Sequence, residues 1–587
     1  MKKIGIGYEF YKRMIDDNCY YVDKTLLIRD VYEKGGTVTL FTRPRRFGKT
    51  LALSTLQTFL EDERNRQGNR IDNSRYFENK KIMLEGSDDI KSRMGQYPVI
   101  NLSLKSGKQS DFYNSFMILR KTIIDEYSRH SYIINSDKLD DRDKNEFSSL
   151  LNGEEDWRIL EKTFKNEADR KRAFQIEVGK YAVALKTLSE LLAKYHGHKT
   201  VILIDEYDVP LENSYQLGFY DEMVSFIRSL FESALKTNTS LELAVITGCL
   251  RISKESIFTG LNNLEVNSIN GEDFGEYFGF TQKETEEMLI EYGLPDHIET
   301  VKDWYDGYLF GQTEVYNPWS VIKYVKVHVA NPNSFPEPYW SNTSSNSIIK
   351  EMIEGADDSV KNELDTLISG GAIEKQIHED ITYGDIHESD DSLWNFLYFT
   401  GYLKKVSERF ADSTTFLTMK IPNREIAYIY KNQLRQWFDK KIKGLDYSPL
   451  YDAISSGKPE GIEDFVNSLL AKSISYFDND ESFYHGFFLS LLYGMPDYSV
   501  RSNREEGNGR TDIVLYPDNP KDPAYIFELK QRKKFSEMEE GLKEALDQIV
   551  LQKYEDGIID DGYVGSVSYG ICFCKKRCIV GLLDSYQ

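Results

Sequence analysis

The chain has 587 residues, 40% of them hydrophobic and 13% aromatic, which predicts about three or four folded domains of ~150 residues each and excludes a disordered chain. A formal net charge of -22 and a pI of about 5.0 exclude a general polyanion binder, so a nucleic acid would need a local basic patch or a metal ion. Five cysteines exclude a disulfide framework, and neither a signal peptide nor an apolar run near the ~20 residues that span a bilayer is found. We therefore expect a cytoplasmic protein.

The N-terminal segment, residues 1–36, contains the run Tyr20–Thr25, which reads Y-Y-V-D-K-T and is followed by an apolar helical pattern. Asp23 or Thr25 is the expected N-cap of that helix, because either side chain can accept a hydrogen bond from a free backbone amide. The two tyrosines either line a purine pocket or belong to the hydrophobic core, and the sequence leaves both interpretations open.

The run Thr37–Leu51 predicts a β-strand, a phosphate-binding loop and the start of a helix. It offers backbone amides at a helix N-terminus, a lysine for the β- and γ-phosphates and a hydroxyl for Mg²⁺, in the order that a nucleotide site needs. The usual first glycine is replaced by Arg43, and the following Pro44 predicts a loop that is bent in a different way. The candidate nucleotide ligands in this run are Arg46, Phe47, Gly48, Lys49 and Thr50, with Thr50 also a candidate Mg²⁺ ligand.

The next strand is expected at residues 98–104, and residues 112–195 are mostly helical by pattern. Within them, residues 135–172 are dense in Asp, Glu, Lys and Arg, which is typical of a solvated helical insertion. A partner-binding role for this charged segment is the alternative.

Two further apolar strands end in polar residues. Four buried β-formers precede Asp205 and Glu206, and ligands bind at such strand ends in open α/β sheets. We expect Asp205 to hold Mg²⁺ through water and Glu206 to orient or deprotonate the attacking water. The following strand leads to Thr247, a candidate γ-phosphate sensor, and to Arg251, which is either an arginine finger in cis or across an oligomer, or a structural ion-pair residue.

Residues 276–345 read as helices broken by Gly and Pro, which we interpret as a helical lid. In the segment 346–440 an apolar helix at 393–403 is followed by a strand and turn at 416–423, which indicates a winged-helix-like module. Such modules bind DNA in some proteins and only pack in others, so position alone assigns no role.

The C-terminal part contains a second constellation of acids. Asp512 stands at the start of a predicted strand, and Glu528 follows sixteen residues later within Y-I-F-E-L-K. Strand alternation places Glu528 and Lys530 on one face. Phosphodiester hydrolysis needs carboxylates that hold Mg²⁺ and a lysine that steadies the nucleophile, so Asp512, Glu528 and Lys530 are the candidate catalytic residues, the two acids also the metal ligands.

Flanking segments offer additional groups for this site. The upstream helix could bring Glu481 or His485 close, and the downstream helix carries Gln548 and Tyr554. The run 531–534, Q-R-K-K, is either a contact to backbone phosphates or a solvated loop. The three C-terminal cysteines are interpreted as core thiols, with a zinc site as the weaker alternative: Cys572, Cys574 and Cys578.

Taken together, these motifs resemble the bacterial AAA-ATPase-like proteins that pair an ATPase domain with a C-terminal PD-(D/E)xK nuclease-like domain. The resemblance covers essentially the whole chain, and that family carries a similar arginine at the first-glycine position, which argues for a variant loop rather than a dead one. It implies a fold and a site more than a biological role. The motifs that carry it are 21–25, 43–50, 203–208, 247–263, 304–308 and 316–320.

We therefore predict an α/β protein with four parts: an AAA-like P-loop NTPase domain with a helical insertion, a helical lid, a winged-helix-like linker and a restriction-endonuclease-like α/β domain. The expected ranges are 1–275 with the insertion at 112–195, 276–345, 346–440 and 441–587.

The predicted function is an ATP-gated deoxyribonuclease that uses ATP and Mg²⁺. DNA is the expected partner, with RNA left open, no membrane contact, and a homo-oligomer as an open alternative. The rival interpretation is a nucleotide-switched binding or signalling protein whose C-terminal domain grips nucleic acid or a partner without cutting it, and a third is a protein with neither activity.

Overall fold

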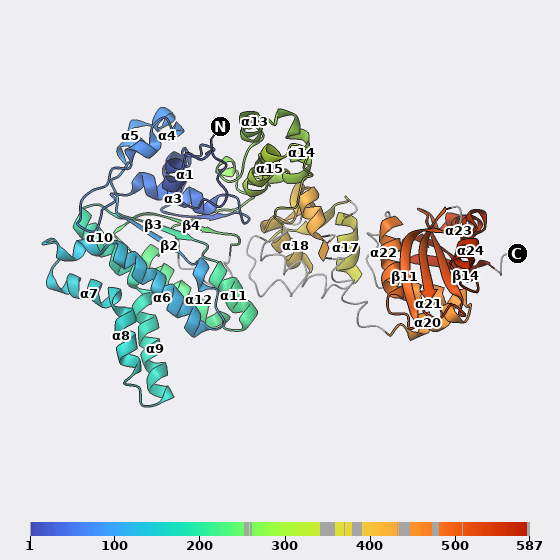
Figure 1. Cartoon of the computed structure of the whole chain (residues 1–587). Coiled ribbons are helices and arrows are strands. Elements are labelled where there is room, and N and C mark those ends of the chain that lie inside the picture. The colour runs from blue at the N-terminus through green and yellow to red at the C-terminus, as the bar shows by residue number, and fades with distance from the viewer. Residues whose placement is uncertain are drawn as a thin grey trace. The chain divides into compact units, whose positions relative to one another are not determined.

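The computed structural model divides the chain into two compact units, of which unit 1 comprises residues 1–343 and 372–428 and unit 2 comprises residues 344–371 and 429–587 (Figure 1). The residues that the structure describes are 2–236, 238–251, 257–258, 261–340, 358–368, 370–378, 390–411, 413–430, 432–433, 446–471, 481–506 and 509–583.

Unit 1 is built on a five-stranded parallel sheet in the order β2-β3-β4-β1-β5. Its strands are β1 (Val38–Thr42), β2 (Val99–Ser103), β3 (Thr200–Asp205), β4 (Leu241–Gly248) and β5 (Leu264–Asn267). Every residue of β1 and β3 is buried, because helices cover both faces of the sheet. Since β4 lies between β1 and β3, the loops that follow these three strands meet at one edge of the sheet.

Helices α1 (Tyr11–Asp16) and α3 (Lys49–Leu60) lie on one face of this sheet, and α6 (Phe112–Arg129), α10 (Ala184–His196) and α12 (Tyr220–Phe231) lie on the other (Figure 1). The expected helical insertion consists of α6, α7 (Asp141–Leu151), α8 (Gly153–Glu161), α9 (Glu167–Ala182) and α10. Short polar side chains cap the N-termini of α6, α7 and α9, for example the Asp140 and Asp143 capping box of α7. The remaining helices here are α2 (Leu27–Lys34), α4 (Lys81–Glu85), α5 (Asp88–Ser92) and α11 (Val209–Leu217).

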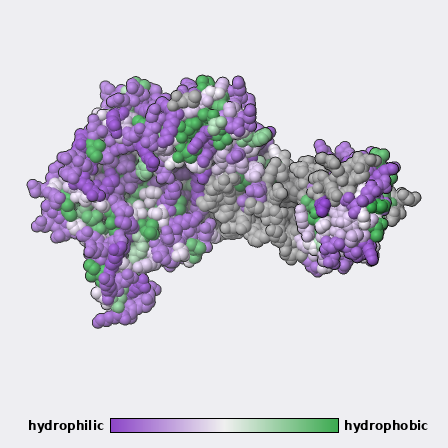
Figure 2. Space-filling view, viewed as in Figure 1, coloured by the Kyte–Doolittle hydropathy of each residue, from purple (hydrophilic) through white to green (hydrophobic). Residues whose placement is uncertain are grey.

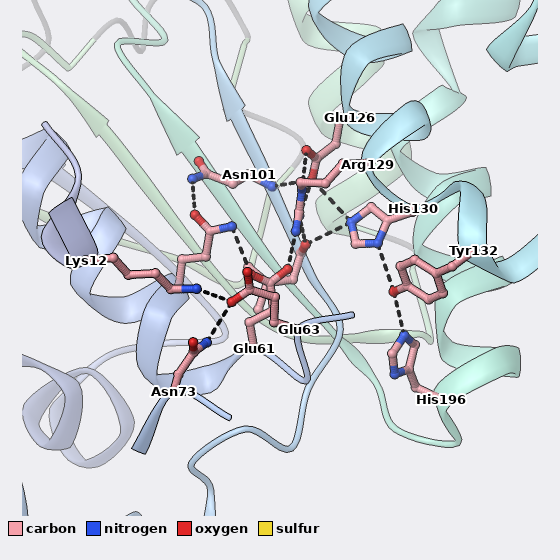
Figure 3. Close-up of polar contacts among 12 residues, drawn as sticks. Lys12, Glu61, Glu63, Asn73, Asn101, Glu126, Arg129, His130, Tyr132 and His196 are labelled. Atoms are coloured by element: carbon pink, nitrogen blue, oxygen red, sulfur yellow. Dashed lines mark hydrogen bonds and ion pairs between the residues drawn. The ribbon is translucent and has the colours of Figure 1, made fainter. Parts of the chain in front are cut away.

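A buried polar network fastens the insertion to the sheet (Figure 3). Arg129 at the end of α6 donates to Glu61, which follows α3, and to Glu126, so two buried carboxylates share one guanidinium. The phosphate loop lies at the other end of α3, roughly 18 Å away for a helix of this length, so this network serves the fold. Further hydrogen bonds join His130, Tyr132, His196 and Asp62.

The remainder of unit 1 follows β5. An aromatic core joins α13 (Gln282–Glu291), α14 (Ile298–Tyr305) and α15 (Pro318–Ala330), and a hairpin, β6 (Tyr308–Phe310) with β7 (Thr313–Val315), stands between the last two. Residues 372–428 form the antiparallel sheet β8-β10-β9 and helix α18 (Asp390–Phe399). Its strands are β8 (Ile373–Gln376), β9 (Lys404–Ala411) and β10 (Thr414–Lys420). The expected winged-helix-like segment, 346–440, is thus divided between the two units, and its assignment stays a prediction.

Unit 2 contains a mixed sheet in the order β11-β12-β13-β14-β15, in which only β13 and β14 run parallel among the described strand pairs. The strands are β11 (Tyr498–Glu506), β12 (Gly509–Pro517), β13 (Ala524–Gln531), β14 (Ser566–Cys574) and β15 (Arg577–Leu582). The helices are α17 (Asp358–Ile368), α20 (Ser448–Ser455), α21 (Pro459–Ala471), α22 (Glu481–Leu492), α23 (Met538–Gln552) and α24 (Tyr554–Asp560).

The three C-terminal cysteines are buried free thiols, and burial raises the pKa of Cys572 to about 11. Two of them belong to the core that α23 forms with the sheet. Within the described ranges, no group of three or more His, Cys, Asp or Glu side chains could hold a metal ion. The burial of these thiols supports their interpretation as core residues.

On the face of unit 1 that Figure 2 shows, hydrophilic side chains predominate over scattered apolar ones, as the charged composition predicts. None of the helices in the described part of the chain is long and apolar enough to cross a membrane.

Candidate functional sites

The phosphate loop joins β1 to α3 and turns twice through the left-handed region. Gly48 has a φ of 87° and Arg46 a φ of 71°. Gly48 also has no side chain with which to cap α3, so the first amides of the helix stay free for an anion. Lys49 is buried and its Nζ donates to the carbonyl oxygens of Arg43 at 2.8 Å and Pro44 at 3.0 Å. Its ammonium group thus lies over the loop that would surround a phosphate.

Arg43, which replaces the usual first glycine, is folded into the protein. Its guanidinium donates to the backbone oxygen of Asn267 at 2.7 Å and to the side-chain oxygen of the same residue at 2.5 Å. The rings of Phe278 and Phe310 lie 5.1 and 5.3 Å from it. Full burial lowers the pKa of Arg43 to about 9. The side chain therefore points away from the phosphate loop and leaves its concave side open.

Asp205 is the point where the three strand ends converge. Thr50 at the start of α3 donates its hydroxyl to one carboxylate oxygen at 2.6 Å, and Thr247 at the end of β4 donates to the other. Glu206 follows with a φ of 52°, and burial together with the neighbouring Asp205 raises the pKa of its carboxyl group. Lys49 counters this rise. The arrangement brings two hydroxyls, two acids and a lysine to one edge of the sheet.

Three residues that support this edge carry no role in the sequence-based prediction. Asp208 accepts hydrogen bonds from the amides of Cys249 at 2.7 Å and Leu250 at 3.2 Å, which fixes the loop after β4. Tyr207 donates its hydroxyl to the carbonyl of Leu250 at 2.6 Å. A side chain at Gly248 would come within 2.5 Å of the Tyr207 ring. These residues belong to the sequence motifs L-I-D-E-Y-D and T-G. The sequence gives no sign that the two motifs contact each other, because about forty residues separate them.

Arg251 lies three residues after the end of β4, at the border of residues 252–256, which lie outside the described ranges. Its role as an arginine finger stays a prediction. The N-terminal tyrosines pack on other rings: Tyr21 lies 5.1 Å from Tyr11, and Tyr20 lies 5.6 Å from Tyr292. These contacts favour the core interpretation over a purine pocket.

In unit 2, the second constellation lies at the junction of β12 and β13. The antiparallel register pairs residue 513 with 527, so one further step places Asp512 opposite Glu528. A carboxylate oxygen of Asp512 accepts from the amide of Leu529 at 2.8 Å, and Lys530 Nζ lies 3.1 Å from Glu528 Oε1. Glu528 is 1% exposed, and burial together with Asp512 raises its pKa to about 7. Its Oε2 has no hydrogen-bond partner within the described part of the chain.

Flanking groups approach the same pair of acids. His485 on α22 contacts the carbonyl oxygen of Asp512 at 2.9 Å through Nε2. Gln548 on α23 donates to the hydroxyl of Tyr554 at 3.2 Å. Burial raises the pKa of Tyr554, and the charges of Glu528 and Asp512 add to this rise. The two downstream residues thus contact each other, and their place in the acid site stays a prediction. The side chain of Glu481 lies outside the described residues.

The basic run at 531–534 is only partly available. Arg532 pairs with Glu544 on α23, whereas Lys533 and Lys534 are exposed, and Lys534 lies 3.7 Å from Glu537. A phosphate contact would therefore rest mainly on the two lysines.

Comparison with known proteins matches the two candidate sites to two different family models. Residues 5–258 match the family described as "Predicted AAA-ATPase", and residues 479–582 match the PD-(D/E)XK nuclease superfamily. A protein of Azotobacter chroococcum mcd 1 named "Uncharacterized protein in vnfD 5'region" is 22% identical over 544 residues, which are 90% of this chain and 89% of that protein. Residues 259–478 lie in neither family match.

Proposed function

The chain carries an AAA-ATPase-like domain at residues 5–258 and a PD-(D/E)XK nuclease superfamily domain at residues 479–582. On this basis we propose that the protein binds and hydrolyses ATP and is a Mg²⁺-dependent, ATP-gated deoxyribonuclease. The observation that carries the proposal is the presence of two separate acid sites, one beside a phosphate loop in unit 1 and one on paired strands in unit 2.

In the nucleotide site, the amides of Arg46, Phe47 and Gly48 would surround the phosphates, with Lys49 contacting the β- and γ-oxygens. Thr50 and Asp205 are hydrogen-bonded at 2.6 Å, which suits a hydroxyl and a carboxylate that share a hydrated Mg²⁺.

The remaining polar groups of this site act on the reacting phosphate. Glu206 would orient or deprotonate the attacking water. Thr247 would report on the γ-phosphate through Asp205, to which it is hydrogen-bonded. Arg251 would stabilise negative charge that develops on the phosphate, in cis or across a homo-oligomer.

The nuclease-like site fits a divalent cation. Among the described residues, Glu528 Oε2 is buried without a hydrogen-bond partner, and oxygen ligands are what Mg²⁺ prefers. Asp512 and Glu528 would hold the ion, which when bound would polarise a phosphate oxygen and lower the pKa of a water molecule. Lys530, next to Glu528, would steady the nucleophile. A third acid is expected from the region of Glu481.

DNA is the proposed substrate class, with RNA as a second outcome of the test. The net charge of -22 opposes binding of a polyanion, so Mg²⁺ and exposed lysines such as Lys533 would have to offset it. The rival interpretation is a nucleotide-switched binding or signalling protein whose C-terminal domain binds nucleic acid or a partner without cleavage, and it predicts ATP turnover without cutting.

The test separates the two sites. Purified full-length protein is incubated with Mg²⁺ and plasmid DNA, linear DNA or RNA, and ATP turnover is measured in parallel. We expect Glu528→Ala to abolish cleavage and to leave ATP turnover intact, and Lys49→Ala to abolish ATP turnover. Exposed residues provide matched controls, Glu539→Ala and Lys165→Ala, which should alter neither activity. Turnover of ATP by a wild type that cuts no DNA or RNA would support the rival; no turnover would remove the ATPase assignment.

A further inference from the structure

Several side chains of the phosphate loop contact segments that neither family match covers, whereas Arg45 pairs with Glu212 inside the ATPase-like match. Phe47 is fully buried between Tyr308, at a ring distance of 4.9 Å, and Phe310, at 5.2 Å. A side chain at Gly401 would come within 3.0 Å of Pro44, so the segment after α18 lies directly on the loop. The Phe47 and Pro44 side chains thus pack on later segments of unit 1, whereas the backbone of the loop remains available to a phosphate.

Arg46 is the strained member of this loop. A left-handed backbone with φ of 71° is unfavourable for any residue with a side chain, and it persists only where the surroundings hold it. The Arg46 guanidinium lies 4.1 Å from the centroid of the Trp319 ring, and Nη1 donates to the carbonyl oxygen of Tyr339 at 3.4 Å. The lid therefore supplies the contacts that hold this backbone conformation.

Trp319 is itself fixed by a buried hydrogen-bond arrangement at the start of α15. The side-chain oxygen of Asn317 accepts from the Trp319 amide at 3.0 Å. The next residue, Ser320, donates its hydroxyl to the carboxylate of Glu425 at 2.8 Å, and the amide of Trp340 donates to the same carboxylate at 2.8 Å. Glu425 is fully buried, and its charge attracts Arg46. Three separate segments of unit 1 thus fix the start of α15, from which the Trp319 side chain projects.

A loop with left-handed residues at positions 46 and 48 directs successive amides toward one side, which is the geometry of an anion nest. Glycine adopts this conformation without help at position 48, whereas position 46 carries an arginine. The stacking contact of Arg46 with Trp319 stabilises the left-handed backbone at position 46, which a glycine would adopt without such a contact.

We propose that Trp319 is a positioning residue for the nucleotide triphosphate: by stacking on Arg46, it holds the phosphate loop in the conformation whose amides bind the phosphates. This inference rests on the proposed ATP binding and adds a determinant of affinity that lies outside the matched ATPase-like segment. Lys323 also lies over the Trp319 ring, at 5.1 Å, so a substitution at position 319 removes two cation contacts, and the test must isolate the one with Arg46.

A double-mutant cycle isolates it. ATP affinity in the presence of Mg²⁺ is measured by calorimetry on full-length wild type, Trp319→Leu, Arg46→Gly and the double variant. We expect Trp319→Leu to weaken ATP binding about five- to tenfold, the size expected for a partly desolvated cation-π contact. In the Arg46→Gly background the same substitution should change affinity less than about twofold, because glycine needs no clamp.

Two further variants guard against a folding artefact. Trp319→Phe keeps an aromatic face and should retain affinity within about threefold of wild type. Trp304→Leu removes a lid tryptophan that packs on Tyr305 and should leave affinity unchanged. Equal losses for Trp319→Leu in both backgrounds, or no loss in either, would overturn the proposal. A wild type that binds no ATP would overturn the proposed function itself, and this inference with it.

Discussion

Replacing Glu425 by Gln should make unit 1 more stable at alkaline pH. The Glu425 carboxyl group is fully buried and accepts hydrogen bonds from the hydroxyl of Ser320 and the amide of Trp340. A glutamine carbonyl oxygen can accept the same hydrogen bonds and carries no charge at any pH. The substitution therefore removes the ionisation of a buried acid and keeps the shape of the site.

The magnitude follows from the pKa. Burial raises the pKa of Glu425 to about 7 from the usual 4.5, so the folded protein holds this proton more tightly than the unfolded chain. Stability is therefore lost as pH rises from about 4.5 through 7. A difference of one pKa unit corresponds to about 1.4 kcal/mol, so ionisation of Glu425 costs about 3 kcal/mol when complete. About 2 to 3 kcal/mol of this cost should appear between pH 5 and pH 8.

The assay is urea unfolding of the full chain at pH 5, 6.5 and 8, followed by tryptophan fluorescence. The quantity compared is the variant minus the wild type at each pH, because other groups titrate in this range. Burial lowers the pKa of His130 to about 4, so the contribution of His130 to the free energy of unfolding is lost as pH falls, opposite to that of Glu425. The exposed Glu408→Gln is the matched control and should show no pH-dependent difference. Equal free energies of unfolding for Glu425→Gln and wild type at both pH 5 and pH 8 would show that ionisation of Glu425 has no such cost.

Three further changes test other parts of the account. Arg129→Met leaves two buried carboxylates without a cation and should lower the free energy of unfolding by about 3 to 5 kcal/mol; a loss below about 1 kcal/mol in urea unfolding would contradict this. Gly248→Ala places a methyl group 2.5 Å from the Tyr207 ring. It should lower the free energy of unfolding by about 1 to 3 kcal/mol and abolish most ATP turnover. Turnover at the wild-type rate would be evidence against the contact. Glu528→Gln should abolish Mg²⁺-dependent cleavage and yet stabilise unit 2 at pH 8, because it removes a buried charge whose pKa is about 7; destabilisation at pH 8 in a thermal melt would show that Lys530 outweighs that cost.

Much of the nucleotide site could be predicted because its signals are local. The phosphate-loop residues Gly48, Lys49 and Thr50 are consecutive, and the apolar run of the next strand ends visibly at Asp205. The side-chain hydrogen bonds that join Thr50 and Thr247 to Asp205 link segments far apart in the sequence, so only the strand order β1-β4-β3 reveals them.

The surroundings of the phosphate loop could not be predicted in this way. Arg43 reaches Asn267, and Arg46 reaches Trp319, each across more than two hundred residues of chain. Sequence periodicity reports which residues are buried and says nothing about such partners. The burial of Glu425 could not be predicted either, because a lone glutamate in a polar segment is most often exposed.

In unit 2, alternation along β13 correctly placed Glu528 and Lys530 on one face. The position of Asp512 opposite Glu528 depends on the register of β12 against β13, which the sequence of either strand leaves open.

The most direct test of the central claim is whether ATP controls DNA cleavage. The rate of plasmid cleavage with Mg²⁺ is measured with and without ATP for wild type and for Lys49→Ala, each as the full chain. We expect that ATP changes the wild-type rate, that Lys49→Ala still cuts, and that the rate of this variant no longer responds to ATP. A wild-type rate that is the same with and without ATP, or a response to ATP that survives in Lys49→Ala, would contradict it.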